Sequence, residues 1–260
     1  MISGSQQIAV IFAALLGVGL NQYLGKSVMT DWGWRIPFIV GCLIVPFLFY
    51  IRRMLEETEA FNQRKHRPSM SEITRSVASN WQLVLVGMFM VVTTTVSFYL
   101  ITAFTPTYGK TVLQFTAQQS FLVTLLVGIS NLFWLPVMGS LSDKVGRRPL
   151  LLLFSVLMLL TSYPSLNWLV AHPSFAHLIE VELWLSFMYA SYNGAMVVCL
   201  TEIMPAEVRA SGFSMAYSLA TAIFGGFTPA ISSYLIHATG DKAMPGMWLS
   251  AAAACGLIAA

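Results

Sequence analysis

The sequence predicts an all-α polytopic membrane helical bundle with about eight spanning helices. Hydrophobic residues make up 57% of its 260 residues and charged residues 10%, whereas about 25% of an average soluble domain is charged. Long apolar runs alternate with short polar segments along the whole chain. The basic residues lie mostly between these runs and the formal charge is only +3, so we expect a lipid bilayer and no nucleic acid as partner.

A helix needs about 20 mostly apolar residues to cross the hydrocarbon core. Eight runs meet or approach this length, at 5–24, 36–52, 82–104, 120–139, 149–169, 180–201, 210–236 and 246–260. The last run would rise only about 23 Å, and the first begins almost at Met1. We therefore expect the chain to be truncated at both ends.

The Lys and Arg residues indicate an orientation, because short loops rich in them stay in the cytoplasm. The loops after the second, fourth and sixth runs hold ten of these residues, and the loops on the opposite side hold four. The N-terminus of the chain is therefore expected in the cytoplasm, in a multi-pass protein of the cell inner membrane.

The segment 53–80 is the one long polar stretch, in which three Glu residues precede several basic residues. We favour a linker between two helix bundles, with 1–52 closing the first bundle and 81–260 forming the second. A solvated charged run with a basic face toward the membrane is the alternative.

Polar side chains within the spans are costly unless they face a partner or a wet cavity. They are therefore candidates for a permeation path. Alternatively, threonine bonds back to its own helix, and Tyr or Asn joins neighbouring helices. The close spacing of the last three candidates favours a substrate cavity, for which the full set is Gln6, Gln7, Thr94, Thr95, Tyr99, Asn131, Tyr189, Tyr192 and Asn193.

The seventh run contains Gly225, Gly226 and Pro229. Glycine weakens a helix and proline removes one of its hydrogen bonds, so the sequence predicts a helix break at this point. Close packing would explain the glycines equally well, but the proline favours a break.

A polar stretch of ten residues separates the fourth run from the fifth. We expect Gly139 and Gly146 to form a tight turn, Asp143 to cap a helix or form a salt bridge, and Arg147 and Arg148 to anchor the next helix at the anionic cytoplasmic leaflet.

Glu202 and Arg209 follow the sixth run on the same side of the membrane. We hypothesise that Arg147 or Arg148 pairs with Glu202 in one conformation and releases it in another, as a cytoplasmic gate. Static anchoring by the positive charges is the alternative.

The remaining ionisable residues favour ordinary roles. Glu180 and Glu182 open the sixth run, where negative charge suits a helix N-terminus, and we prefer this interpretation over proton coupling. The three cysteines lack the spacing of metal ligands, and no nucleophile triad or phosphate loop is present. We expect no enzymatic activity, no catalytic residue, no cofactor and no metal.

Several segments together resemble a known family. Gly139-x-Leu-x-Asp-x-x-Gly-Arg-Arg148 looks like the cytoplasmic turn motif of the major facilitator superfamily, and 205–212 looks like its later counterpart. Residues 32–38, 53–61 and 221–230 resemble the metabolite:proton symporter family. Within this family, residues 63–68, 105–109, 127–131 and 192–196 are similar to the bacterial citrate and tricarballylate permeases.

The resemblance implies the major facilitator fold, of whose twelve helices this chain would hold about eight. It also implies proton-coupled symport of citrate, or a related tricarboxylate such as tricarballylate, by alternating access. The partners would be that small tricarboxylate and protons, and the full-length protein would be monomeric. A transport-incompetent half-transporter, or an assembly product of an interrupted gene, is the alternative.

Overall fold

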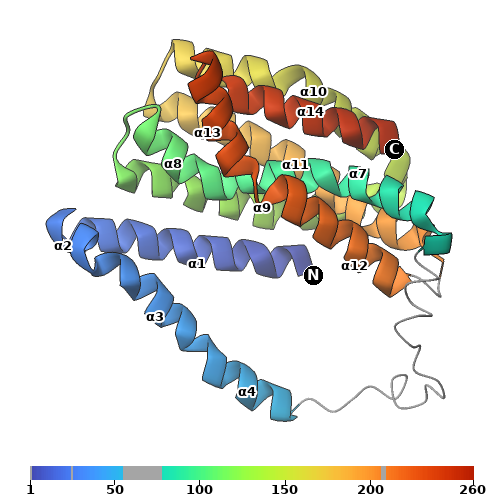
Figure 1. The fold of residues 1–260 in the computed structure, drawn as a ribbon, viewed down its shortest axis with the longest axis horizontal. Helices are drawn as coiled ribbons and strands as arrows, with labels where there is room; N and C mark the ends of the chain where they lie inside the picture. The colour runs from blue at the N-terminus through green and yellow to red at the C-terminus, as the bar shows by residue number, and fades with distance from the viewer. Residues whose placement is uncertain (1, 25, 55–77, 206–208) are drawn as a thin grey trace.

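The computed structural model describes residues 2–24, 26–54, 78–205 and 209–260, and every regular element in these ranges is a helix (Figure 1). The predicted linker at 53–80 lies almost entirely outside the described residues. Seven described stretches are long and apolar enough to cross a membrane, and an eighth apolar helix has 16 residues. This confirms the predicted all-α membrane bundle.

The first two predicted spans diverge, because the first packs against the rest of the bundle and the second leads away from it. Short helices at the bend connect a long first helix to an outlying arm, which Figure 1 shows leading away from the bundle. Side chains of this arm are mostly exposed. The elements are α1 (Ile2–Tyr23), α2 (Lys26–Asp31), η1 (Gly33–Arg35), α3 (Ile36–Cys42) and α4 (Ile44–Met54).

The third span is longer than predicted because it continues through a π-helical segment and a proline. It consists of α7 (Trp81–Phe98), the π-helix η2 (Tyr99–Phe104) and α8 (Thr105–Thr111). Pro106 lies in the first turn of α8, where the missing N–H costs little. A π-helical segment holds one extra residue and often marks a functional site.

The next three spans are long, uninterrupted helices: α9 (Ala117–Val145), α10 (Arg147–Ala171) and α11 (Phe175–Ile203). Thr116 and Gln119 form a capping box at the start of α9, and the Ser174 side chain accepts from the His177 N–H at the start of α11. Such caps satisfy N–H groups that have no partner within the helix.

The predicted turn at Gly139 is wrong, because α9 continues through this residue to Val145. The chain reverses only at Gly146, whose φ of 100° is accessible to glycine without strain. Gly139 instead lies inside the helix and faces Gly194 of α11.

The last part of the chain is interrupted where Gly225, Gly226 and Pro229 occur. A π-helical turn replaces the α-helix, and the Gly226 N–H donates to the Thr221 carbonyl five residues earlier at 2.7 Å. Pro229 then lies in the first turn of a new helix. The elements are α12 (Arg209–Ala220), η3 (Thr221–Gly225), α13 (Thr228–Thr239) and α14 (Met244–Ala259).

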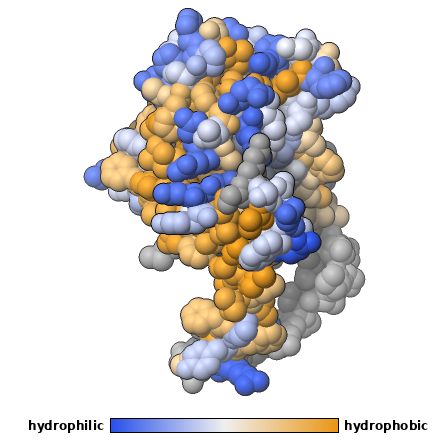
Figure 2. All heavy atoms as spheres, turned by 90° about the vertical axis from the view of Figure 1, so that its left-hand side faces the viewer, coloured by the Kyte–Doolittle hydropathy of each residue, from blue (hydrophilic) through white to orange (hydrophobic). Residues whose placement is uncertain are grey.

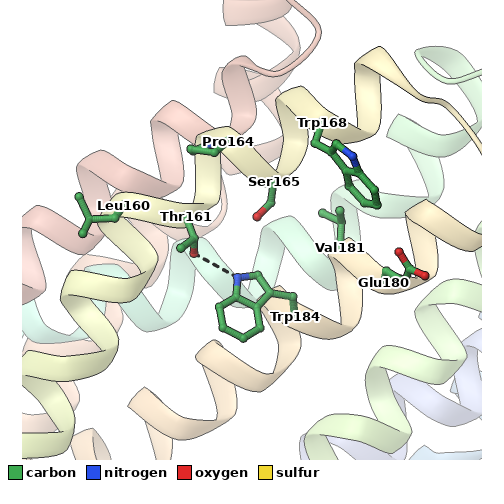
Figure 3. Close-up of a pocket in the computed structure, with 8 residues that line it drawn as sticks. All are labelled: Leu160, Thr161, Pro164, Ser165, Trp168, Glu180, Val181 and Trp184. Carbon is green, nitrogen blue, oxygen red and sulfur yellow. Dashed lines mark hydrogen bonds between the residues drawn. The ribbon is translucent and has the colours of Figure 1, made fainter.

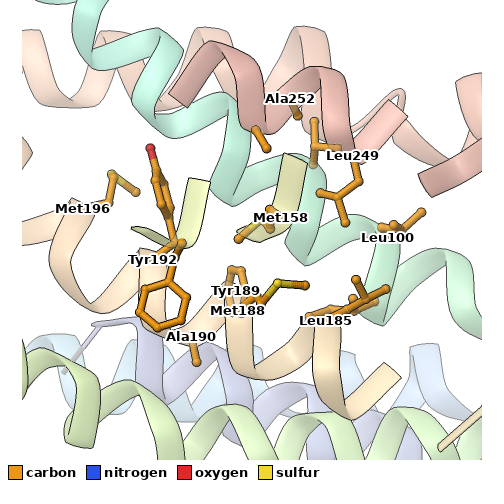
Figure 4. Close-up of a cluster of buried hydrophobic side chains, with 14 of the residues drawn as sticks. Leu100, Met158, Leu185, Met188, Tyr189, Ala190, Tyr192, Met196, Leu249 and Ala252 are labelled. Atoms are coloured by element: carbon orange, nitrogen blue, oxygen red, sulfur yellow. The ribbon is translucent and has the colours of Figure 1, made fainter. Parts of the chain in front are cut away.

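The helices pack with α11 at the centre. It contacts α9 on one side and α10 and α7 on another, while α1 lies along α9 and α14 lies along α7 and α10. Figure 4 shows the buried cluster that joins α11 to its neighbours, with Tyr189, Tyr192 and Met188 among its largest side chains. Figure 2 shows hydrophilic residues over the end of the bundle that faces the viewer and hydrophobic residues along the α3–α4 arm.

The crossing of α9 and α11 depends on small residues. A Cβ atom on Gly194 would lie 3.0 Å from the Gly139 backbone nitrogen and 3.3 Å from the Leu135 carbonyl oxygen. A Cβ atom on Gly139 would meet no atom closer than 3.9 Å. In lipid, helices associate through such close packing rather than through a hydrophobic driving force.

The two glycines therefore predict different mutational effects. We expect Gly194→Ala to destabilise the protein by about 1–3 kcal/mol, because rigid backbone must move apart. Gly139→Ala is the matched control, and we expect it to be neutral or stabilising by up to about 1 kcal/mol through helix propensity. Thermal unfolding in detergent micelles measures both, and equal effects would contradict the asymmetric contact.

Candidate functional site

Helix α11 carries a polar stripe on one face. Glu182, Ser186, Tyr189 and Asn193 are spaced by four, three and four residues, which places them on the same side of a helix. All four side chains are buried. Tyr189 is the middle residue of this 29-residue helix, so the stripe runs from about 10 Å on one side of the middle to about 6 Å on the other.

Asn131 connects this stripe to two other helices. Its Nδ2 donates to Gln7 Oε1 of α1 at 3.1 Å, and its Oδ1 accepts from the Ser186 hydroxyl at 2.8 Å. Asn131 is also the middle residue of its own helix, α9. Gln7, Asn131, Ser186, Tyr189 and Asn193 together form what we call the mid-membrane cluster.

Two atoms of the mid-membrane cluster have unused hydrogen-bonding capacity. Gln7 Nε2 and Asn193 Oδ1 are buried without a hydrogen-bond partner among the described residues, although Asn193 Nδ2 lies 3.4 Å from the Tyr189 hydroxyl. Buried polar atoms are nearly always paired, so each exception needs an explanation. A donor and an acceptor that are both free at mid-membrane suit a polar ligand.

The other predicted cavity residues lie elsewhere. Gln6 is exposed, and the Tyr192 hydroxyl donates to the Met90 carbonyl of α7 at 3.1 Å. Thr95 bonds back to carbonyls of its own helix, and Thr94 is buried with its hydroxyl unpartnered among the described residues. Tyr99 is half-buried and packs on Gly225.

Sequence reasoning missed Ser130 and Ser186 and assigned Glu182 to a helix end. Ser186 lies 2.9 Å from Ser130, and Glu182 is only 3% exposed. For Glu182 and Ser186 the signal was present in the spacing, because they precede Tyr189 and Asn193 at intervals of four, three and four residues on the same helix. Serine is so common in membrane helices as a backbone-bonding residue that the pattern was not distinctive.

Arg147 forms the second polar site, at the end of the bundle that contains the Gly146 turn. Its Nη1 lies 2.6 Å from Asp143 Oδ1 and its Nη2 lies 3.3 Å from Glu202 Oε1. The structure therefore brings Arg147 and Glu202 together, while Arg148 is exposed. Arg209 donates from Nε to the Met204 carbonyl at 3.3 Å.

Two open pockets lie outside the mid-membrane cluster. One of about 470 Å³ opens between α10 and α11, where the Trp184 indole N–H donates to the Thr161 hydroxyl at 3.1 Å (Figure 3). Another of about 520 Å³ lies beside Pro136 of α9. Neither is lined by a residue that the sequence placed in the substrate cavity.

Comparison with known proteins adds three relatives. The chain is 58% identical to the citrate-proton symporter of Klebsiella pneumoniae over 257 residues and 54% identical to that of Salmonella typhi, in each case over 99% of its own length. It is 29% identical to the proline/betaine transporter of Escherichia coli (strain K12) over 94% of its length.

The chain spans 58% and 59% of the lengths of the two citrate-proton symporters. Residues 1–229 match the Major Facilitator Superfamily as a family, which agrees with the all-helical bundle and the motif at the Gly146 turn. The chain is a member of the Major Facilitator Superfamily.

Proposed function

We propose that this protein works in proton-coupled symport of citrate, or of a related tricarboxylate such as tricarballylate, across the cell inner membrane. The identity of 58% to a citrate-proton symporter carries this proposal. The protein would act by alternating access and not as an enzyme. In the orientation that the positive residues favour, the Arg147 end and the N-terminus of the chain face the cytoplasm.

The mid-membrane cluster is the proposed substrate contact. It joins α1, which we assign to one helix bundle, to α9 and α11 of the other, and a site between two bundles near the midplane suits alternating access. Gln7 and Tyr189 can donate to a carboxylate, and Asn193 can accept from a hydroxyl or a protonated carboxyl. No Lys or Arg side chain is buried among the described residues, so this region would contribute hydrogen bonds and not positive charge.

A chimera tests the proposed function. In it, this chain replaces the 257 matching residues of the Klebsiella symporter, and the protein is reconstituted into proteoliposomes. We expect uptake of labelled citrate that requires an inward proton gradient, with tricarballylate as a competitor to define the substrate. A folded, inserted chimera that takes up no citrate would refute the proposal.

Asn131→Ala tests the mid-membrane cluster. Its removal leaves Gln7 Oε1 without its buried partner and takes one hydrogen-bond partner from Ser186, and leaving a buried polar group unpaired costs about 1–3 kcal/mol. We expect citrate uptake at low substrate concentration to fall by roughly 5- to 100-fold.

Ser162→Ala is the matched control for Asn131→Ala, because its buried hydroxyl bonds to the Met158 carbonyl one turn earlier in its own helix. We expect uptake within about twofold of the parent, since no interhelical contact is lost. If both variants behave alike, the cluster has no part in substrate transport.

We also propose that Arg147 and Glu202 form a gate at the cytoplasmic end. Arg147 is the first residue of α10, and Glu202 lies near the end of α11. Relative motion of these two helices would therefore separate the pair. The Glu202 side chain is 56% exposed, and exposed pairs are screened by water. The pair would therefore bias a conformational equilibrium and not lock it.

A double-mutant cycle tests the gate. We expect Arg147→Glu and Glu202→Arg each to change the rate of citrate exchange and the double variant to recover part of it, with a coupling of about two- to fivefold. Lys144→Glu makes the same charge change at the same end as a control. If the effects of the two single substitutions on the exchange rate simply add in the double variant, the gate is wrong and Arg147 only anchors its helix.

A further inference from the structure

We propose that Glu182 is the group that carries the coupled proton. This inference rests on the proposed proton symport and assigns one residue of this chain to it. It departs from the interpretation of Glu182 as a negative charge at a helix start. Four observations support it: the burial of the side chain, its hydrogen bonds, its free oxygen and its distance from the mid-membrane cluster.

Glu182 is the one Asp, Glu, Lys or Arg side chain that is fully buried among the described residues. It lies seven residues from the middle of α11, which is about 10 Å along the helix, and the hydrocarbon core extends about 15 Å from its midplane. An ionisable side chain at that depth is costly and is retained mainly for function. Glu180, two residues earlier, is exposed instead.

The contacts of Glu182 can accommodate a proton on the carboxyl group. The Thr105 hydroxyl oxygen lies 2.8 Å from Glu182 Oε1 and 3.1 Å from the Leu100 carbonyl oxygen. A hydroxyl has one hydrogen, so it cannot donate fully to both acceptors. When Glu182 is protonated, its O–H can donate to Thr105 while Thr105 donates to Leu100, and all three groups are satisfied.

The second carboxyl oxygen of Glu182 is free to exchange the proton. Oε2 is buried and has no hydrogen-bond partner among the described residues. The side chain borders a cavity of about 10 Å³, which is at the lower limit for one water molecule. Tyr108 lines the same cavity, and its hydroxyl donates to the Lys242 carbonyl at 2.9 Å. Lys242 is exposed at the end of the bundle that we propose faces outward.

In the part of the chain that the structure describes, no cation pairs with Glu182 to stabilise its charge. From α8 the titratable group that faces it is Tyr108, while Asp241 and Lys242 lie beyond Tyr108 in the turn between α13 and α14. The cavity is otherwise lined by apolar residues of η2, α10, α11 and α14, namely Leu100, Phe104, Leu166, Leu185 and Pro245. Among the described residues Glu182 takes part in no ion pair.

The distance to the mid-membrane cluster explains how proton and substrate would be coupled. Glu182 is one helical turn from Ser186, about 6 Å along α11. An ionised carboxylate so close to an anionic substrate would repel it strongly in a low-dielectric interior. Glu182 takes up a proton from the outer side and becomes neutral, the anion binds, and after reorientation the same proton leaves to the cytoplasm as the carboxylate re-forms.

Glu182→Gln in the reconstituted chimera tests this proposal, because glutamine mimics the protonated carboxyl and cannot release a proton. We expect citrate accumulation driven by a proton gradient to fall more than tenfold. Exchange of labelled for unlabelled citrate at equal pH on both sides should remain within about threefold of the parent. Citrate-dependent proton influx, followed with a pH-sensitive dye inside the vesicles, should disappear.

Glu180→Gln is the matched control and should retain accumulation, exchange and proton influx. A Glu182→Gln protein that still accumulates citrate against its gradient overturns the proposal. So does one that folds but loses exchange as well, because Glu182 would then serve structure or substrate binding. If the parent chimera itself neither accumulates nor exchanges citrate, the failure belongs to the proposed function instead.

Discussion

The close approach of α9 and α11 at Gly139 and Gly194 determines where the polar groups of this protein meet. Because the two backbones come so near, short side chains on facing helices can reach each other. Asn131 of α9 bonds to Ser186 of α11 in the middle of the span. Arg147, the first residue of α10 directly after the Gly146 turn, reaches Glu202 near the end of α11 with its long side chain. In a bilayer, where apolar side chains gain little by leaving lipid, such backbone proximity and hydrogen bonding hold helices together.

Helix α11 serves two purposes on two faces. Met188 and Tyr192 belong to the buried cluster that joins it to α7, α10 and α14, and the Tyr192 hydroxyl secures α7 through the Met90 carbonyl. The stripe from Glu182 to Asn193 instead collects polar groups that have incomplete hydrogen bonding. One face of the helix is rigidly packed and supports a second face whose polar atoms lack some of their hydrogen bonds. This arrangement suits the binding of a polar ligand at a defined position.

Much of the fold was predictable because the thickness of the hydrocarbon core imposes a length on every span. All eight predicted runs correspond to helices, and the described helices differ from them mainly by extending further at their ends. Gly139 was misassigned because glycine among charged residues is typical of turns. Backbone hydrogen bonding carries the helix past it, and only the positive φ of Gly146 ends it.

The site was less predictable, because composition does not reveal which way a side chain faces. Gln6 and Gln7 are neighbours in sequence, yet only the second is buried against α9. Glu180 and Glu182 likewise point in different directions, since residues two apart on a helix are separated by about 200°. Choosing between such neighbours requires the position of the partner helix, which a single sequence does not contain.

The π-helical segment η2 accommodates one extra residue in the third span. Because its turn is wider than an α-helical turn, the helix beyond it keeps its direction, and α8 presents Thr105 to Glu182. What the wide turn changes is local: the Thr105 N–H donates to the Leu100 carbonyl five residues earlier, and the Thr105 hydroxyl oxygen lies 3.1 Å from the same carbonyl oxygen. Loss of one residue from 99–104 would restore an α-helical turn and give this carbonyl other partners. The hydrogen bonding next to the carboxyl group therefore depends on the length of the segment.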